Sequence, residues 1–172
     1  TPAPETWLHF PGNFFQPATI LDLVVYHNEH KNLQRIKEYH YGVVYQDIFS
    51  NVHKNAVAIF MAELIMKCLK QSESNLSLYE FLEDAFIHLD ESNDAVTANF
   101  PLFFALHLPV FFGFKPPSPL KGIFGDPRNF YFDLKEGMFV NEKPDHPNFL
   151  EGKHAEVTNE LLKVMQPEEL EE

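Results

Sequence analysis

Cysteine is almost absent from the sequence, because Cys68 is the single thiol among 172 residues. One thiol excludes an intrachain disulfide and a thiolate zinc cage, which both need more than one cysteine. A reducing environment suits such a chain, so we expect a cytoplasmic location. The first residue is Thr1 rather than Met, and no basic and apolar leader opens the chain. We therefore expect a part of a longer protein.

Basic side chains are also scarce. The 13 Lys and Arg residues stand against 25 Asp and Glu residues, which gives a formal net charge of −12. Because nucleic-acid affinity depends on Lys and Arg that neutralise phosphates, this balance excludes a broad basic footprint. Any surface for DNA must therefore be local.

Sequence motifs for catalysis are missing. The chain contains no Gly-x-x-x-x-Gly-Lys loop, no Gly-x-Gly-x-x-Gly and no Gly-x-Ser-x-Gly elbow. We therefore expect neither an enzyme nor a cofactor. The nine histidines leave a histidine-based metalloenzyme as an alternative, with His27, His30 and His40 as the candidate ligands. No His-Glu-x-x-His motif supports it, so no metal site is predicted. The pair Asp145 and His146 resembles two-thirds of a catalytic triad, but no nucleophile motif accompanies it.

Charged residues are missing from one long stretch, "NFPLFFALHLPVFFGF" over residues 99–114. A membrane span needs about 20 apolar residues, and this stretch is shorter and contains two prolines and a histidine. We therefore expect no membrane insertion. We predict instead a core helix that begins after an Asn93 cap and ends at Gly113. Pro101 should kink or restart this helix, with Asn99 as a second cap.

Hydrophobic periodicity predicts the other elements. They are a β-hairpin with strands near residues 20–25 and 33–41, a helix over 52–70 with a broad apolar face, a helix over 77–91 with a capping box of Ser77 and Glu80, short strands at 131–134 and 138–140 around Gly137, and a helix over 154–166. The segments 1–17 and 115–129 are rich in proline and should be irregular. The predicted fold class is α+β and mainly α-helical.

Several of these segments together resemble one known family. A strand pair followed by "AVAIFMAEL", "LYEFLEDAFIHLD" and "ANFPLFFALHLPVFFGF" resembles the bacterial DNA repair and recombination mediator family RecO, in the form found in Bacteroidetes-type bacteria. The segments "FDLKEGMFV" and "ELLKVMQPEELEE" extend the resemblance over nearly all residues from Gln16 onward.

The resemblance implies an N-terminal OB-fold, then a helical domain with a small zinc-ribbon-like knuckle. Residues 1–45 would be a partial OB-fold, reduced to its β-hairpin, and residues 46–172 the helical domain, with the knuckle hairpin at about 128–142. Members of the family bind and anneal single-stranded DNA. They act with RecR and with the C-terminal tail of the single-stranded-DNA-binding protein to load the RecA recombinase. We therefore expect single-stranded DNA, RecR and that tail as partners, and no membrane.

This sequence departs from the family pattern in three ways. The early OB-fold strands and a last helical segment are absent, so we expect much of the family's basic face to be missing. The cysteines that hold zinc in some members are absent, so the knuckle is cysteine-free and no metal is expected. Some relatives place arginine where Ala98 and Asn99 stand here before Phe100, which changes the expected contact with a tail carboxylate.

The predicted hairpin supplies the candidate DNA-binding residues. An OB-fold binds single strands with basic side chains and with aromatic faces on which bases stack. The candidates are Lys31, Arg35, Lys37, Tyr39 and Tyr41, and the last four share one strand face by the period of two. The alternative is a solvated, charged sheet face beside two half-buried tyrosines.

A partner tail that is acidic and ends in phenylalanine needs an apolar pocket with a basic rim. The candidates for this pocket are Phe103, Phe104 and His107 of the core helix, with Lys54 and Lys67 of the helix before it. Core packing is the alternative role of each phenylalanine. The second function class is an acidic helical protein-interaction module without direct DNA binding, which would show no salt-sensitive DNA binding.

Overall fold

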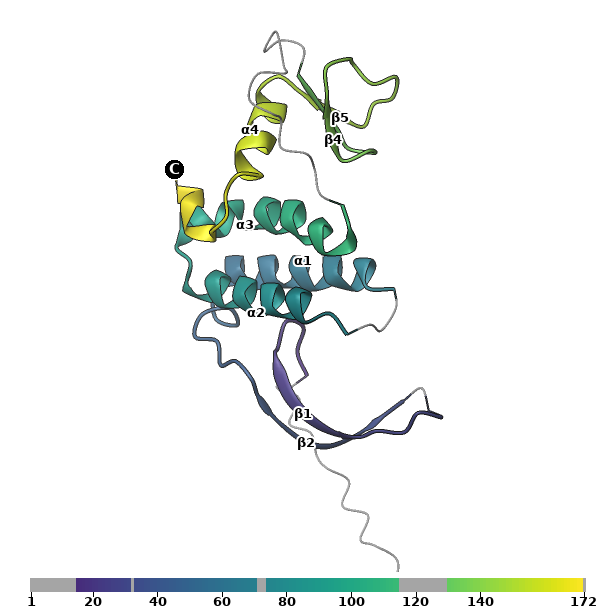
Figure 1. Cartoon of the computed structure of the whole chain (residues 1–172). Helices are drawn as coiled ribbons and strands as arrows, with labels where there is room; N and C mark the ends of the chain where they lie inside the picture. The colour runs from purple at the N-terminus through teal and green to yellow at the C-terminus, as the bar shows by residue number, and fades with distance from the viewer. Residues whose placement is uncertain (1–14, 32, 71–73, 115–129, 172) are drawn as a thin grey trace, which may run out of the picture.

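A long two-stranded hairpin, a layer of three helices and a small three-stranded sheet follow one another along the chain (Figure 1). This computed structural model describes residues 15–31, 33–70, 74–114 and 130–171. The predicted irregular segments over residues 1–14 and 115–129 lie outside these ranges. The fold is mixed, with helices and small antiparallel sheets, as the sequence predicts.

Three capped helices form the centre of the molecule: α1 (Val52–Cys68), α2 (Leu76–Glu91) and α3 (Asp94–His107). Each begins after an asparagine whose side-chain oxygen accepts backbone N–H groups of the first turn; the three caps are Asn51, Asn75 and Asn93. The Asn93 cap confirms its prediction. The predicted capping box of Ser77 and Glu80 is wrong, because Asn75 accepts from the N–H of Leu78 and starts α2 earlier.

Helix α3 passes through Pro101 without restarting, and the 3-10 helix η1 (Leu108–Phe112) continues it. Asn99 does not cap a second helix, because its Nδ2 donates to the carbonyls of Ala95 and Leu170, both at 3.3 Å. Gly113 ends η1 with a φ of 85°, in the left-handed conformation that glycine adopts most easily. The predicted end of this helix is therefore confirmed.

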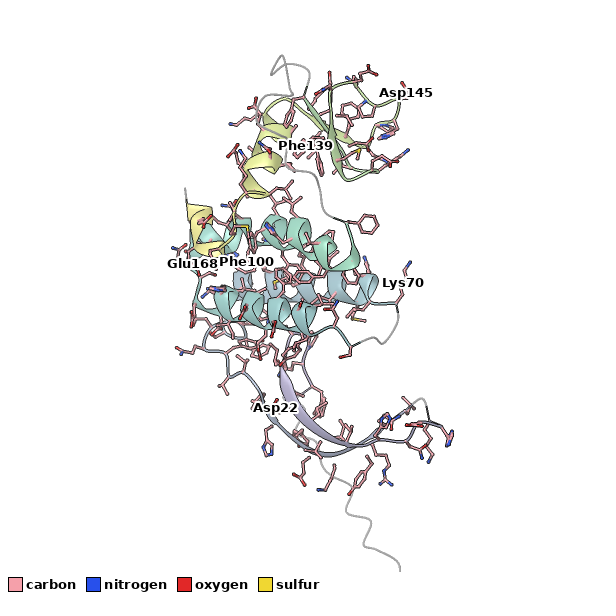
Figure 2. All side chains as sticks on the ribbon, in the orientation of Figure 1. Asp22, Lys70, Phe100, Phe139, Asp145 and Glu168 are labelled. Atoms are coloured by element: carbon pink, nitrogen blue, oxygen red, sulfur yellow. The ribbon has the colours of Figure 1, made fainter. Side chains whose placement is uncertain are left out.

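The stretch Asp94–Phe112 is long and apolar enough to cross a membrane by length and composition, with 19 residues and a mean hydropathy of 1.6. This run is longer than the sequence predicts. Core helices pass the same test, and here Phe100, Phe104 and Leu108 are at most 1% exposed within the protein. Figure 2 shows Phe100 inside the helical layer. One side of this stretch thus forms the centre of the core, while Leu102 and Val110 are 55% and 41% exposed.

Aromatic rings join α2 to α3 and η1. The ring of Phe81 on α2 stacks on that of Phe104 at 5.6 Å and on that of Phe111 at 4.7 Å. Together with Phe100 and Leu89, these rings belong to one continuous core. Stacked rings at this separation add stabilisation beyond their buried area.

Helix α1 contributes less to the core than its sequence predicts. Ala58 and Met61 are buried, but Ile59 and Phe60 are 42% and 40% exposed and Met66 is 77% exposed. Only one side of α1 meets α2 and α3 (Figure 1). The broad apolar face predicted for α1 is therefore partly open to solvent.

A buried carboxylate joins the segment before α1 to the end of α2. Asp90 is 9% exposed, and its carboxylate accepts the backbone N–H groups of Gln46, Asp47 and Ile48, each at 2.8 Å. Lys54 of α1 is 4% exposed and donates to the backbone carbonyl of Asp90 at 2.6 Å and to the carboxylate of Asp47 at 3.2 Å. Polar groups of an irregular segment are thus paired in the interior.

Strands β1 (Leu21–Tyr26) and β2 (Arg35–Tyr41) form the antiparallel hairpin, which meets the helices at one end and extends away from them (Figure 1). At that end Ala18, Ile20 and Tyr45 pack against the helical core. The hydroxyl of Tyr45 donates to the carbonyl of Ala18 at 3.1 Å. Burial raises the pKa of Tyr45, and nearby Asp90 raises it further, so the hydroxyl stays a neutral donor.

The small sheet places β3 (Tyr131–Asp133) between β4 (Met138–Val140) and β5 (Phe149–Glu151), with all pairs antiparallel. The first two strands and the turn at Gly137, which has a φ of 63°, confirm their prediction, whereas β5 was not predicted. Helix α4 (Lys153–Leu161) covers the sheet through Ala155 and ends earlier than predicted. The short 3-10 helix η3 (Pro167–Glu171) then packs against α3.

Replacing Asp90 with alanine should lower the free energy of unfolding by about 3–5 kcal/mol, the range for removing one partner from a buried charged network. The reason is that the N–H groups of Gln46, Asp47 and Ile48 lose their acceptor. Urea unfolding followed by circular dichroism measures the loss. Asp90→Asn should lose less free energy of unfolding than Asp90→Ala, because the introduced amide oxygen can still accept a hydrogen bond from the backbone. The matched control is Glu91→Ala at an exposed neighbour, and equal losses at the two positions would contradict the prediction.

Candidate nucleic-acid and partner-binding sites

A β-bulge divides the hairpin into two parts. Val24 of β1 pairs with Glu38 of β2, but the next residue, Val25, pairs with Ile36. Lys37 is therefore the extra residue that has no partner in the register. Because directly paired residues share a face of the sheet, the bulge changes which side chains of β2 lie together.

The bulge places Arg35 on the face opposite to Tyr39 and Tyr41. The two tyrosines pair with Leu23 and Leu21 and share their face, whereas Arg35 pairs with Tyr26 on the other face. The prediction that these basic and aromatic residues share one face is therefore wrong. The period of two on which it was based holds only for an uninterrupted strand.

The face opposite the two tyrosines carries Asp22 and Glu38 as well as Arg35, and it contains an internal ion pair. The ammonium of Lys37 lies 2.9 Å from the carboxylate of Glu38. Neighbours in a regular strand point to opposite faces, so this contact depends on the bulge. The hydrogen bond and charge of Glu38 raise the pKa of Lys37, and Lys37 in turn lowers the pKa of Glu38. Arg35 is exposed on the same part of the hairpin.

Lys31 lies in the turn that closes the hairpin and is exposed. Its carbonyl accepts from the side-chain amide of Gln34 at 2.7 Å, and the side-chain oxygen of Gln34 accepts the N–H of Asn28 at 2.7 Å. These bonds hold the turn that carries Lys31. Lys31 and Arg35 therefore lie at the end of the hairpin farthest from the helices.

The other face of the hairpin is apolar and largely open. Leu23, Val25 and Tyr41 are 46%, 41% and 38% exposed, and the ring of Tyr39 packs against that of Phe15 at 5.6 Å. Neither Lys37 nor Arg35 lies on this face. The five predicted DNA-binding residues are thus split, with the two tyrosines on this face and the three basic residues elsewhere on the hairpin.

The five residues predicted for a partner pocket do not meet on one surface. Phe103 and Phe104 are buried in the core, and Lys54 is buried beside Asp90 rather than exposed on a rim. His107 is half-buried, with its ring 4.3 Å from that of Phe103 and its Nδ1 hydrogen-bonded to the carbonyl of Phe103 at 2.8 Å. Only Lys67, in the last turn of α1, is exposed.

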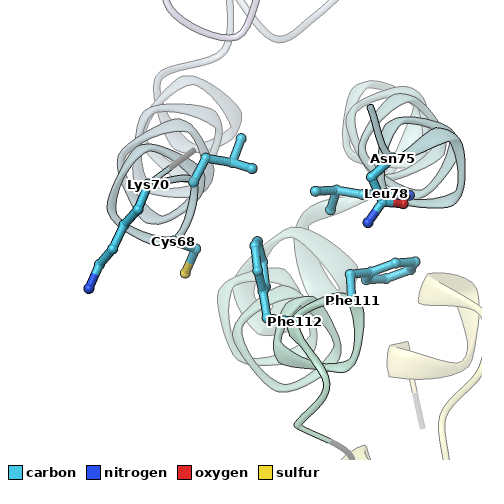
Figure 3. Close-up of a pocket in the computed structure, with 7 residues that line it drawn as sticks. Cys68, Lys70, Asn75, Leu78, Phe111 and Phe112 are labelled. Carbon is cyan, nitrogen blue, oxygen red and sulfur yellow. Dashed lines mark hydrogen bonds between the residues drawn. The ribbon is translucent and has the colours of Figure 1, made fainter. Parts of the chain in front are cut away.

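A different pocket lies where α1 ends, α2 begins and η1 crosses beside them (Figure 3). It encloses about 400 Å³ and is lined by Cys68, Leu69, Lys70, Asn75, Leu78, Phe111 and Phe112. Its lining mixes rings and aliphatic side chains with the polar groups of Cys68, Lys70 and Asn75. Lys70 lies at the edge and its ammonium points outward (Figure 3). None of the described residues that line the pocket is acidic. We name it the helix-end pocket.

Sequence reasoning missed the helix-end pocket because its parts come from three separate segments. A weak signal was present in "KCLK", which puts lysines at the end of an apolar helix, and in the paired rings Phe111 and Phe112. Neither pattern shows that the two segments meet.

The structure does not gather the candidate metal ligands. Among the described residues, no three His, Cys, Asp or Glu side chains lie close enough together to hold a metal ion. His27, His30 and His40 are exposed along the hairpin and its turn. The metalloenzyme alternative thus gains no geometric support from this part of the chain.

A buried acid–histidine pair fastens the small sheet instead. Asp133 is 6% exposed, and its Oδ1 accepts the N–H groups of Lys135 at 2.8 Å and Glu136 at 3.2 Å. Its Oδ2 lies 3.2 Å from Nε2 of His146, which links β3 to the segment before β5. His146 is therefore paired with Asp133 and not with its sequence neighbour Asp145. Burial acts to raise the pKa of Asp133, but these hydrogen bonds and the nearby imidazole outweigh it, so the net shift is downward.

The helical layer, the small sheet and α4 are the part of the chain that a family of DNA recombination proteins matches, over residues 50–163. That family is described as "Recombination protein O C terminal", and the chain belongs to it. The resemblance to RecO found in the sequence is thereby confirmed.

Curated relatives support the same assignment. The "DNA repair protein RecO" of Azobacteroides pseudotrichonymphae is 30% identical over 158 residues, which is 91% of this chain and 62% of the relative. The protein of the same name from Flavobacterium johnsoniae is 31% identical over 127 residues, 74% of this chain and 50% of the relative. The chain thus spans 50% to 62% of the length of these two relatives. No solved structure matches it.

The stability contributed by the Asp133 carboxylate should depend on pH. Because the folded protein holds its pKa below the ordinary 3.8, the carboxylate stabilises the fold above that pH. This contribution should disappear as the pH falls through the lower pKa of the folded state. Urea unfolding over about pH 2 to about pH 6 should show Asp133→Asn less stable than the natural chain at the upper end only. A constant difference at every pH would contradict the prediction, and Asp145→Asn is the matched control.

Proposed function

We propose that this protein is a mediator of DNA repair and homologous recombination. It binds and anneals single-stranded DNA and acts with RecR and the single-stranded-DNA-binding protein to load RecA. The observation that carries this proposal is the match to the RecO family over residues 50–163, together with the DNA repair names of its relatives. No enzymatic step belongs to the proposal.

The basic end of the hairpin is the proposed contact with single-stranded DNA. Lys31, Arg35 and Lys37 are exposed there, and the flexible cationic side chains suit phosphate groups. Tyr39 and Tyr41 lie on the opposite apolar face, so one strand of DNA would not use both sets along a single path. We assign the tyrosine face to packing within the N-terminal OB-fold domain that the RecO resemblance implies.

The helix-end pocket is the proposed site for the C-terminal tail of the single-stranded-DNA-binding protein. An acidic tail that ends in phenylalanine would place its ring against Phe111 and Phe112 and a carboxylate near Lys70. The described lining supports this assignment because it sets two rings and two leucines beside a single lysine and includes no acidic residue. It replaces the set of Phe103, Phe104 and Lys54, which are buried.

An acidic protein-interaction module without direct DNA binding is the second candidate function. The net charge of −12 favours it, because such a charge repels phosphates over most of the surface. The two candidates differ in one property: the first predicts DNA binding that weakens with salt, and the second predicts none.

The chain should accelerate the annealing of two complementary strands coated with single-stranded-DNA-binding protein, and Arg35→Ala should slow this reaction. The reason is the loss of one phosphate contact, which should also reduce the salt slope of single-strand binding by about 0.7. Fluorescence-quench annealing and salt-titrated anisotropy measure the two effects. Lys135→Ala on the small sheet removes the same charge at a distance and should change neither. No acceleration by the well-folded natural chain would favour the interaction module.

Lys70→Glu should weaken binding of a synthetic acidic peptide ending in Asp-Phe by about tenfold, because a charge-assisted contact becomes a repulsion. Isothermal titration calorimetry measures the change. Phe112→Ser tests the apolar half of the pocket separately. The control Lys135→Glu has the same charge change elsewhere. If Lys135→Glu lowered the affinity for the peptide as much as Lys70→Glu does, overall charge alone would explain the effect and the assigned pocket would be wrong.

A further inference from the structure

We propose that the groove between α3, α4 and η3 is a docking site for a basic amphipathic helix of a partner protein. The surface is separate from the hairpin and from the helix-end pocket, and the proposal goes beyond the DNA-binding and tail-binding roles given above. It rests on the shape of the groove, on the apolar side chains that the fold leaves uncovered there, and on the charges around them.

The groove encloses about 1040 Å³ and is larger than the helix-end pocket. Its lining residues are Asn99, Leu102, Lys153, Glu156, Val157, Glu160, Leu161, Lys163, Val164, Glu168, Glu169 and Leu170. This volume is at the upper end of that of small-molecule sites, and the lining comes from α3, α4, η3 and the segment between α4 and η3. In Figure 1, α4 lies above α3. A groove between helices suits an added helix better than a compact ligand.

The floor of the groove is apolar. Leu102 of α3 and Val157 of α4 are 55% and 45% exposed, while Leu161 and Val164 beside them are half-buried. Leu161 and Val164 pack against the core, so Leu102 and Val157 supply most of the apolar surface that is open to a partner. The apolar side of an amphipathic helix, with residues at spacings of three and four, matches such a surface.

The rim of the groove is acidic. Glu156, Glu160, Glu168 and Glu169 line it, against only two ammonium groups, those of Lys153 and Lys163. Lys163 is paired with Glu160 at 2.8 Å, and Nδ1 of His88 contacts the carboxylate of Glu168, so the net acidity of the rim depends mainly on Glu156 and Glu169 against Lys153. An incoming helix would therefore gain from lysine or arginine on either side of its apolar face.

The same charges argue against the other occupants. A second copy of this chain would carry a net charge of −12 towards an acidic rim, and a nucleic acid would bring phosphates to it. The glutamates of the rim would also repel an acidic peptide tail, whereas Lys70 at the helix-end pocket would attract it. A basic helix is the occupant that complements both the floor and the rim.

The test uses a fluorescein-labelled peptide of leucine and lysine, with a length of about five helical turns and its leucines on one face. Fluorescence anisotropy should show saturable binding to the full chain at physiological salt. The double variant Leu102→Ser/Val157→Ser should weaken binding at least about tenfold, because both changes remove apolar contact from the floor. The double variant Glu156→Gln/Glu169→Gln should also weaken peptide binding, and the remaining affinity should depend less on salt concentration.

Matched controls distinguish binding in the groove from non-specific electrostatic or hydrophobic binding elsewhere on the protein. Val44→Ser changes a 77% exposed valine away from the groove, and Glu29→Gln removes a carboxylate from the hairpin turn. Both should leave affinity within about twofold of the natural chain, and a scrambled peptide without an apolar face should bind weakly. All the substituted positions are exposed, so each variant should fold, and circular dichroism checks that it does.

Three results would overturn the proposal. The first is equal loss of affinity in Val44→Ser and in the groove variant. The second is equal binding of the scrambled peptide, which would show attraction by charge alone. The third is concentration-dependent self-association of the natural chain that Leu102→Ser/Val157→Ser abolishes, which would make a second copy the occupant. None of these depends on DNA annealing, so the docking proposal and the mediator proposal fail independently.

Discussion

The carboxylate of Asp90 is the constraint on which the attachment of the hairpin to the helices depends. Three consecutive N–H groups of the segment before α1 point at one side chain near the end of α2. The segment has no regular structure to satisfy those donors, so without Asp90 it would bury them unpaired. Lys54 closes the arrangement from α1 by bonding the backbone carbonyl of Asp90. The hairpin is thereby attached to the helices through polar bonds as well as through the apolar contacts of Tyr45.

This attachment explains why the candidate surfaces can have separate roles. The hairpin extends from one side of the helical layer, while α4 and the small sheet lie on the other (Figure 1). The helix-end pocket is built from the layer itself. Stacked rings of Phe81, Phe104 and Phe111 keep α2, α3 and η1 together, so the layer has a dense interior between these surfaces.

Much of the local structure could be predicted because it depends on near neighbours. Asn93 starts a helix and Gly113 ends one through bonds that span a few residues, and Gly137 allows a tight turn for the same reason. The pairing of Asp90 with residues more than forty positions away leaves no such trace. Lys54 was accordingly expected on a rim, because nothing near it in sequence shows the buried acceptors that it meets. The basic and aromatic residues proposed for DNA lie in the predicted hairpin, but their division between two faces was not predicted.

The bulge at Lys37 makes β2 one residue longer than β1 over the stretch in which they pair. A substitution at this position would change one side chain and keep the register on either side of it. Deleting the residue would remove the extra position and leave a regular ladder, in which Val24 still pairs with Glu38 and Val25 with Ile36. Arg35 would therefore stay on the face opposite Tyr39 and Tyr41. Among homologous chains, a gap of one residue at this position would mark the loss of the bulge and of one lysine, with the same division of the remaining side chains between the two faces.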